Sequence, residues 1–383
     1  MDFGYAKSLE FYDKDLAYQL KHNIAQFSEF KETSFRNELL NTLTNKGSIL
    51  PWSEFKKKAQ EISGLYNVNW LQTEYNQTVA TANMAGKWQN FQRNKDLYPN
   101  LRYSTAGDSR VRDKHKHWDG FIAPIDHPIW KKLYPPNDWG CRCTVVQTDE
   151  EISADVPDIK VKKEFKNNAA ISGKIFNAPT YVNGITGIDL KYATIKTFQY
   201  LLKNSKGDFK RHLEQLVLKL PRKNQFIEVF TEGEGKVLQH LLVKETAEDF
   251  KEIFETAKAF AKNGQVAEMM PELADKSYMT FRAKVYIDYD LLKNPDLRVD
   301  GVYMDVKRPT AIKNIHGNAN NAHKQGAIAI IHTGKFKITE KQMSNRSNGL
   351  FDKKNINKKE EHSYPYSEVY FIVEGKLLKY NKR

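Results

Sequence analysis

The spacing of apolar residues changes along this chain, and that change most limits what the chain can fold into. Near the beginning, Leu20, Ile24 and Phe27 follow the helical period. Near the other end, apolar residues such as Val302 and Met304 alternate with polar ones, which is the period of a strand. We therefore expect separate domains of different class. The 383 residues are enough for two or three domains, each with its own core.

The first hundred residues predict three helices. The second is expected to begin after Pro51 with Ser53 as its N-cap, and the third to end at Asn94. Residues 101–148 differ, because they are dense in Asp, Arg, His, Pro, Gly and Trp and lack periodic apolar runs. We expect specific polar contacts to hold this segment.

The end of the chain predicts a small α/β or α+β domain. A helix is expected to end at Asn263–Gly264, followed by a short strand. Hairpins are expected to turn at Asp300–Gly301 and at Glu374–Gly375, with a helix and a buried strand between them.

These patterns divide the chain into three predicted parts. Residues 1–150 form a mainly helical region that ends in a loop-rich Cys/His/Asp signature. Residues 151–264 form a linker and helical connector, in which Pro221 and a turn at Gly233–Gly235 are breaks. Residues 265–383 form the small α/β (α+β) domain.

The formal net charge of +13 favours a polyanionic partner, with nucleic acid first and an anionic membrane surface second. A generally basic surface without such a partner is the alternative. No apolar run is long enough to span a membrane, and the N-terminus lacks the pattern of a signal peptide. We expect synthesis in the cytoplasm, with packaging in a particle as the route by which the protein would leave.

The two cysteines, Cys141 and Cys143, lie too close in sequence for an unstrained bridge. Together with His117 or His115 they have the donor types of a zinc site, although CxC is not the usual knuckle spacing. The alternative is a structural network in which Arg142 makes a bidentate pair with a nearby carboxylate. The candidates for that carboxylate are Asp108, Asp119 and Asp138. The network is the favoured interpretation.

The order of residues in this segment resembles the phage Mu F-like head-morphogenesis family over roughly residues 50–148. The matching residues are Asp108, Arg110, Arg112, His115 or His117, Asp119–Gly120, Pro135–Pro136, Trp139 and Cys141–Arg142–Cys143. The resemblance implies a minor head protein that lies near the portal of a capsid, with portal and capsid proteins as partners and contact with packaged DNA.

A second set of polar residues lies near the end of the chain. Asp305 and Lys307 alternate on one predicted strand, so both side chains point to the same face. Asp296 or Asp300 lies just upstream, and Glu272 is a further carboxylate. Such carboxylates can hold Mg²⁺ or another divalent metal on a scissile phosphate, while the lysine stabilises charge.

Metal-independent cleavage of RNA is the other interpretation of the same segment. Here a histidine would act as general acid or base, with His316, His323 and His332 as candidates and Gln325 nearby. The predicted nucleic-acid-binding residues are Arg308, Lys313 and Lys324. A solvated ion pair without catalytic function is the simplest alternative for the Asp305 and Lys307 pair.

This segment resembles the C-terminal tRNase toxin domain of the contact-dependent inhibition protein CdiA over roughly residues 265–340. The matching residues are Pro295, Asp296, Asp300, Gly301, Asp305, Lys307, Pro309, Ala322, Lys324 and Gln325. The D…(D/E)xK layout also describes metal-dependent PD-(D/E)xK nucleases, with Asp305 in place of the commoner Glu.

The sequence therefore predicts a prophage-encoded head-morphogenesis protein fused to a nuclease toxin. The resemblance implies cleavage of RNA, with tRNA first, and a cognate immunity protein as partner. The alternatives are a structural minor head protein whose C-terminal domain binds DNA without cutting it, and a metal-dependent DNase.

Overall fold

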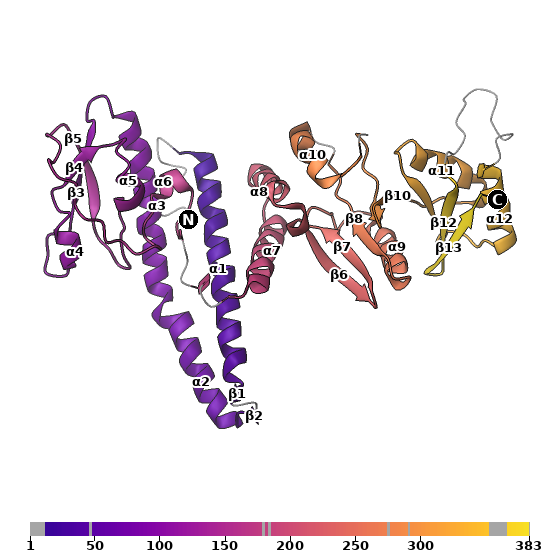
Figure 1. Cartoon of the computed structure of the whole chain (residues 1–383), viewed down its shortest axis with the longest axis horizontal. Coiled ribbons are helices and arrows are strands. Elements are labelled where there is room, and N and C mark those ends of the chain that lie inside the picture. The colour runs from indigo at the N-terminus through magenta and orange to yellow at the C-terminus, as the bar shows by residue number, and fades with distance from the viewer. Residues whose placement is uncertain are drawn as a thin grey trace. The chain divides into compact units, whose positions relative to one another are not determined.

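The computed structural model describes residues 12–45, 48–177, 181–182, 185–273, 276–289, 292–351 and 366–382. The chain forms two compact units, Met1–Ser205 and Lys206–Arg383 (Figure 1). Among the helices described, none is both long enough and apolar enough to cross a membrane. The first unit is mainly helical and the second is built on a sheet, which confirms the expected multidomain organisation.

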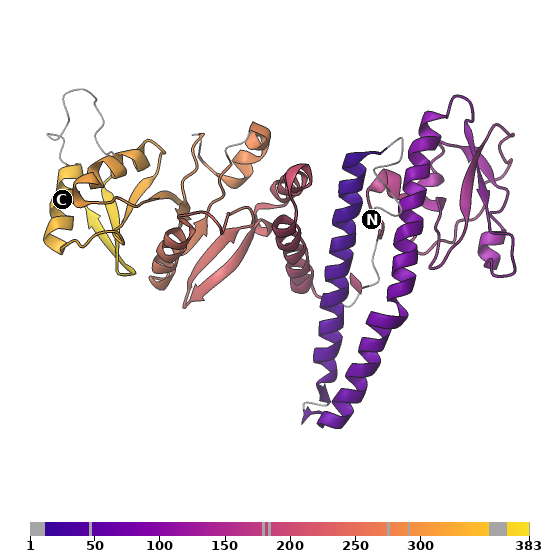
Figure 2. The same cartoon turned by 180° about the vertical axis from the view of Figure 1, so that it is seen from behind.

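The first unit is organised around a long helical hairpin, seen from the front in Figure 1 and from behind in Figure 2. The hairpin is formed by α1 (Lys14–Thr42), α2 (Trp52–Gly64), a π-helical turn η1 (Leu65–Asn69) and α3 (Leu71–Arg93), and α7 (Gly187–Asn204) packs against α1. Strands β1 (Thr44–Asn45) and β2 (Ser48–Ile49) join α1 to α2. Apolar side chains from α1, α2, α3 and α7 form one core, with Leu20, Ala82 and Ala85 among its most buried members.

The ends of these helices test two expectations. Helix α3 has Asn94 as its C-cap, as predicted. The prediction of Ser53 as an N-cap is wrong, because α2 begins at Trp52 and Pro51 occupies the cap position without a side-chain hydrogen bond. A proline fits the start of a helix since its missing N–H needs no partner there.

The loop-rich segment folds around a small antiparallel sheet in the order β4-β3-β5. The elements are β3 (Asn100–Ser104), α4 (Asp113–Lys116), β4 (Ile122–Pro124), α5 (Trp130–Leu133), β5 (Thr144–Thr148) and α6 (Ala169–Ser172). Four large aromatic side chains, Tyr103, Trp118, Trp130 and Tyr134, are fully buried in this core. The segment has no periodic run of aliphatic residues, and these large rings supply the buried apolar area of its core instead.

The second unit is built on an eight-stranded sheet in the order β13-β12-β11-β10-β9-β8-β7-β6. The strands are β6 (Phe226–Glu232), β7 (Gly235–His240), β8 (Val266–Met269), β9 (Leu297–Val299), β10 (Val302–Lys307), β11 (Ile328–His332), β12 (Glu368–Val373) and β13 (Lys376–Asn381). The pairs β7–β8, β10–β11 and β11–β12 are parallel, and the other neighbours are antiparallel.

Helices pack on both faces of this sheet. They are α8 (Gly207–Lys219), α9 (Phe250–Lys262), α10 (Met279–Val285), α11 (Ile315–His323) and α12 (Glu340–Phe351), with 3-10 turns η3 (Arg222–Asn224), η4 (Lys276–Tyr278) and η5 (Ile312–Asn314). Phe260 of α9 shares a core with Met304 and Val306, whereas Ala319 of α11 shares another core with Ile331. Since side chains alternate along a strand, these cores lie on opposite faces.

The predicted turns are confirmed. Asp300, Gly301, Glu374 and Gly375 all have positive φ, as a two-residue hairpin turn requires. Helix α9 ends at Lys262 with Asn263 as its C-cap, and Gly264 follows with a φ of 81°.

The segment predicted as linker and helical connector, residues 151–264, differs from the expectation. It contains helices, but residues 226–240 form the hairpin β6–β7, which joins the sheet through β8. The turn at Gly233, with a φ of 60°, therefore reverses a hairpin rather than interrupting a helix. The boundary between the two compact units falls between Ser205 and Lys206 in the sequence, so this segment is divided between them.

Candidate active site

Strand β10 brings Asp305 and Lys307 together in the second unit. Both side chains point to the same face, and Lys307 Nζ forms an ion pair with Asp305 Oδ2. Asp305 is 2% exposed, and the Lys307 side chain is 19% exposed. These low exposed fractions distinguish the pair from the solvated surface pair that was the simplest alternative. Burial also strengthens the interaction between the two charges.

Gln325, in the turn after α11, holds Asp305 in place. Its Nε2 donates a hydrogen bond of 3.0 Å to Asp305 Oδ2. The backbone carbonyl of Gln325 accepts in turn from the hydroxyl of Tyr289. The structure thus brings the predicted Gln325 to the carboxylate and adds Tyr289, which no sequence pattern had indicated.

Asp296 lies opposite Asp305, because β9 and β10 pair with Leu297 opposite Met304. The N–H of Val306 donates to Asp296 Oδ2 at 2.8 Å, and the N–H of Met270 donates to the Asp296 backbone carbonyl at 2.9 Å. The carboxyl groups of Asp296 and Asp305 also interact directly. The hairpin therefore sets two carboxyl groups and one ammonium side by side.

Both carboxyl groups are harder to ionise than usual. Burial raises the pKa of Asp296 well above its ordinary range, and the neighbouring charge of Asp305 raises it further. Burial also raises the pKa of Asp305, although the ammonium of Lys307 opposes this shift. Two close carboxylates with raised pKa values form a site that a bound cation would stabilise.

A cleft of about 660 Å³ opens at this cluster. Asp296, Gln325 and Lys324 line it, together with residues that follow β7 and β8 and residues that precede β9. Lys244 and Lys293 add positive charge to the lining. Glu272 also lines the cleft and forms an ion pair of 3.3 Å with Lys244, so it borders the cleft without joining the Asp296 and Asp305 pair.

A buried arginine ties together the loops that border the cleft. Arg282 Nη1 donates to Asn294 Oδ1 at 2.8 Å, and the same oxygen accepts from the N–H of Leu273 at 3.1 Å. Tyr286 donates to the carbonyl of Pro271 at 2.6 Å. The sequence analysis did not identify these residues. Asn294 could have been identified because it directly precedes Pro295–Asp296. Arg282 is distant in sequence from these residues, and no motif marks it.

Asp300, the other predicted carboxylate, lies at the tip of the hairpin. Its Oδ1 accepts from the N–H of Val266 at 2.9 Å, and its Oδ2 accepts from Gln265 Nε2 at 3.0 Å. Its φ of 45° is that of a turn residue. Of the two upstream candidates, the structure brings Asp296 and not Asp300 to Asp305.

The three candidate histidines have other contacts. The ring of His323 lies against Tyr366, with ring centroids 5.9 Å apart. His316 Nε2 lies 2.9 Å from the carbonyl of Arg346, and His332 Nδ1 accepts from the N–H of Gly334 at 3.3 Å. Among the described contacts, none joins these histidines to Asp305 or Lys307.

The predicted nucleic-acid-binding residues differ in their surroundings. Lys313 and Lys324 are exposed, and Lys324 lines the cleft. Arg308 instead lies 3.6–4.0 Å from carboxylates at the start of α9, those of Asp249, Glu248 and Glu252. Its charge is therefore partly neutralised within the protein.

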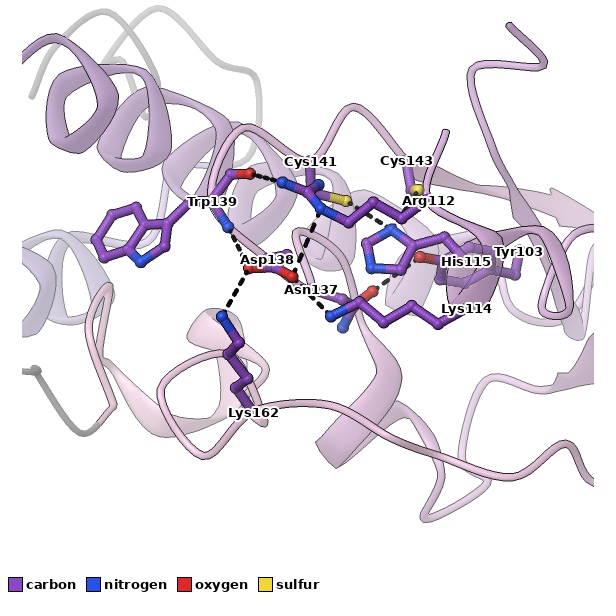
Figure 3. A network of polar contacts seen from close by, with 10 residues as sticks. All are labelled: Tyr103, Arg112, Lys114, His115, Asn137, Asp138, Trp139, Cys141, Cys143 and Lys162. Atoms are coloured by element: carbon purple, nitrogen blue, oxygen red, sulfur yellow. Dashed lines mark hydrogen bonds and ion pairs between the residues drawn. The ribbon is translucent and has the colours of Figure 1, made fainter. Parts of the chain in front are cut away.

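The first unit contains a second polar cluster, drawn in part in Figure 3. Arg142 makes the predicted bidentate pair with Asp108, at 2.7 and 2.6 Å, and these hydrogen bonds hold the pKa of Asp108 well below its usual range. Asp138 accepts from Lys114 Nζ at 2.6 Å and from the N–H of Trp139 at 2.9 Å. These bonds lower the pKa of Asp138 even though burial opposes them.

Beside Asp138 lie the two cysteines and His115. Both thiols are free, and Nδ1 of His115 lies 3.5 Å from Cys143 Sγ and 3.7 Å from Cys141 Sγ (Figure 3). The hydrogen bond between the thiols lowers the pKa of Cys141 to about 4 and raises that of Cys143. His117 is exposed, so of the two predicted histidines the structure places His115, not His117, at the cysteines.

Comparison with known proteins supports both resemblances. Residues 34–146 match the family model described as Phage Mu protein F like protein. Residues 293–362 match the model of the contact-dependent growth inhibition CdiA C-terminal domain. The chain thus combines a Mu F-like segment with a segment similar to the CdiA toxin domain.

Two curated relatives match the first segment. The Mu-like prophage FluMu F protein of Haemophilus influenzae is 36% identical over 99 residues, which are 26% of this chain and 24% of the relative. Protein F of Escherichia phage Mu, named for capsid assembly, is 33% identical over 116 residues, 29% of this chain and 26% of the relative. The matches therefore span about a quarter of the length of these relatives.

One solved structure, the CdiA-CT/CdiI toxin and immunity complex from Burkholderia pseudomallei, shares 16% identity. The match covers 36% of this chain and 88% of that chain, with a TM-score of 0.24. With a TM-score this low, the arrangement of residues in that structure is not applied to this chain.

Proposed function

We propose that the second unit is a metal-dependent nuclease that cleaves RNA, with tRNA as the favoured substrate. The observation that carries the proposal is the convergence of Asp305 and Lys307 on Asp296, which lines the cleft. The site would have two carboxylates for a metal, a lysine for the phosphate and a cleft for the nucleic acid.

The donor set of this site fits a divalent metal such as Mg²⁺. Carboxylate oxygens are the ligands that Mg²⁺ prefers, and Asp296 and Asp305 supply them side by side. A cation between them would offset the repulsion that raises their pKa values. When bound, such a metal would activate a water molecule and neutralise charge on the scissile phosphate.

The residues of the chain have separate tasks in this proposal. Lys307 places a positive charge beside the phosphate as negative charge develops on it. Gln325 orients Asp305 through its hydrogen bond, and Lys324 attracts the phosphate backbone from the cleft wall.

The alternative that depends on histidine has less support. A general acid or base must reach the reacting group, directly or through one water molecule. His316 and His332 make other hydrogen bonds, and His323 lies against Tyr366. We therefore favour the metal-dependent site.

RNA is the proposed substrate because the sequence resembles the CdiA C-terminal tRNase toxin domain, and residues 293–362 match the model of the CdiA C-terminal domain. The net charge of +13 suits any nucleic acid and does not by itself separate RNA from DNA. The Mu F-like segment is proposed to associate the chain with a phage head. A bacterium that makes such a nuclease would need a neutralising immunity protein.

The proposal is tested by incubating the purified full chain with tRNA and, separately, with plasmid DNA, in Mg²⁺ and in EDTA. We expect tRNA cleavage that EDTA stops and that Asp305→Asn abolishes. Asp300→Asn is the matched control, because it changes a carboxylate of the same hairpin outside the site. Plasmid cleavage that EDTA blocks would identify a DNase instead. Binding of nucleic acid without cleavage would support a purely structural head protein.

A further inference from the structure

Three soft donor atoms converge in the loop-rich core of the first unit. They are Nδ1 of His115 at α4, and the sulfurs of Cys141 and Cys143, which lie just before β5. All lie within 4.8 Å of one another, and the three residues are 2%, 8% and 9% exposed. Among the described residues, this is the group of three or more that has the spacing of a metal site.

The surrounding backbone and side chains fix this arrangement independently of any ligand. Gly140, with a φ of 64°, turns the chain between Trp139 and Cys141, and the N–H of Cys141 donates to the carbonyl of Asp138 at 3.1 Å. The ring of His115 stacks on Trp118 with centroids 4.9 Å apart. The donors are therefore preorganised, which lowers the entropic cost of binding a ligand.

Hydrogen bonding leaves this cluster incompletely satisfied. Nδ1 of His115 faces both sulfurs, at 3.5 and 3.7 Å, although a neutral imidazole nitrogen has one lone pair and accepts well from one donor at a time. The other ring nitrogen, Nε2, is buried and has no hydrogen-bond partner among the described residues. Nδ1 is therefore the ring nitrogen that is placed to bind a ligand together with the two sulfurs.

The distances fit tetrahedral zinc. With Zn–N of about 2.05 Å, Zn–S of about 2.3 Å and tetrahedral angles, the nitrogen and sulfur ligands lie about 3.6 Å apart. The two observed separations, 3.5 and 3.7 Å, lie on either side of that value. Thiolate and imidazole are also the ligand types that zinc prefers over Mg²⁺ or Ca²⁺.

We propose that His115 Nδ1, Cys141 Sγ and Cys143 Sγ bind one Zn²⁺ ion. Three donors from the chain leave the fourth tetrahedral position to a water molecule or another external group. The ion would fasten α4 to the segment before β5 and so stabilise the Mu F-like unit, since binding to the folded state alone adds to folding stability. The Arg142–Asp108 pair joins the segment before β5 to the loop that precedes α4 without metal.

The test measures zinc by elemental analysis in full-length protein expressed with zinc and then freed of loosely bound metal. We expect one zinc per chain in the wild type and in the control His117→Ala, whose histidine is exposed. Cys141→Ser and Cys143→Ser should each lose the zinc. Wild-type protein without zinc, or Cys141→Ser and Cys143→Ser variants that retain it, would overturn the proposal.

Cobalt substitution keeps the proposal testable if a cysteine variant fails to fold. Wild-type protein refolded with Co²⁺ should show thiolate-to-cobalt charge-transfer absorption and the visible bands of tetrahedral Co²⁺. A carboxylate site such as the Asp296 and Asp305 pair gives no thiolate band, so the readout is specific to the cysteines. Absence of that absorption in folded wild-type protein would also contradict the proposal.

Discussion

Carboxylates are buried or paired in both units, but the surroundings shift their pKa values in opposite directions. In the first unit, Asp108 and Asp138 have cationic partners and backbone donors, and their pKa values are lowered. In the second unit, Asp305 lies against Asp296, which lines a cleft, and the pKa values of both are raised. The first arrangement is satisfied within the protein and serves the fold. The second retains unfavourable charge that a ligand would relieve, as functional sites often do.

The largest expected difference between the two clusters is the effect of removing Lys307 on the rate of tRNA cleavage. Lys307→Met should lower the rate of tRNA cleavage by about 10²–10³-fold, the usual cost of losing one group that stabilises charge in the transition state. Single-turnover kinetics at saturating tRNA measure the effect. Arg142→Met, which removes a cation from the first unit, should leave the rate within about twofold of wild type. Equal losses in both variants would remove the distinction between the clusters.

Asp138 should contribute more to stability than the more exposed Asp108. Asp138→Ala removes charge-assisted bonds from Lys114 and from the N–H of Trp139. We expect a loss of about 2 kcal/mol in the free energy of unfolding of this unit, in the range for hydrogen bonds to charged groups. Urea denaturation followed by tryptophan fluorescence measures it, and an unchanged midpoint would show that the network adds no stability.

Asp296 should show the opposite effect on stability. Its folded-state pKa is raised, so the protonated form is preferred on folding and stability decreases as pH rises above the unfolded-state pKa. Asp296→Asn should therefore raise the melting temperature of the second unit at neutral pH, with a smaller gain at acid pH. Each kcal/mol corresponds to roughly 2–4 °C for a domain of this size. Calorimetry at several pH values without added metal measures the shift. A lowered melting temperature at neutral pH would mean that the ionised carboxylate stabilises the fold.

The Arg142–Asp108 pair should have the smallest effect. Both side chains are about 40% exposed, at 41% and 38%, so solvent screens the pair despite its bidentate geometry. Arg142→Lys should lower the melting temperature of the first unit only slightly, and this loss should shrink as salt is added. Thermal melts at low and high ionic strength measure it. A larger loss that is independent of salt would show that the guanidinium is needed for packing.

Local sequence predicted the features that depend on neighbouring residues. The turn at Asp300–Gly301, the end of α9 and the shared face of Asp305 and Lys307 all follow from short-range geometry. The hairpin β6–β7 did not, because it becomes part of a sheet only through pairing with β8 across the intervening helix α9.

The choice among several possible partners also required the fold. The sequence left three carboxylates for Arg142, two histidines for the cysteines and two upstream carboxylates for Asp305. The structure selects Asp108, His115 and Asp296. Each selection depends on how distant segments meet, which residue type and local spacing do not specify.

The binding of Mn²⁺, a spectroscopic substitute for Mg²⁺, tests most directly whether the two acidic clusters have different roles. Electron paramagnetic resonance of the full chain titrated with Mn²⁺ counts the bound ions. We predict a site that Asp305→Asn removes and Asp138→Asn leaves intact. Binding that survives Asp305→Asn, or that is lost in Asp138→Asn, would contradict the assignment of the metal-dependent site to the second unit.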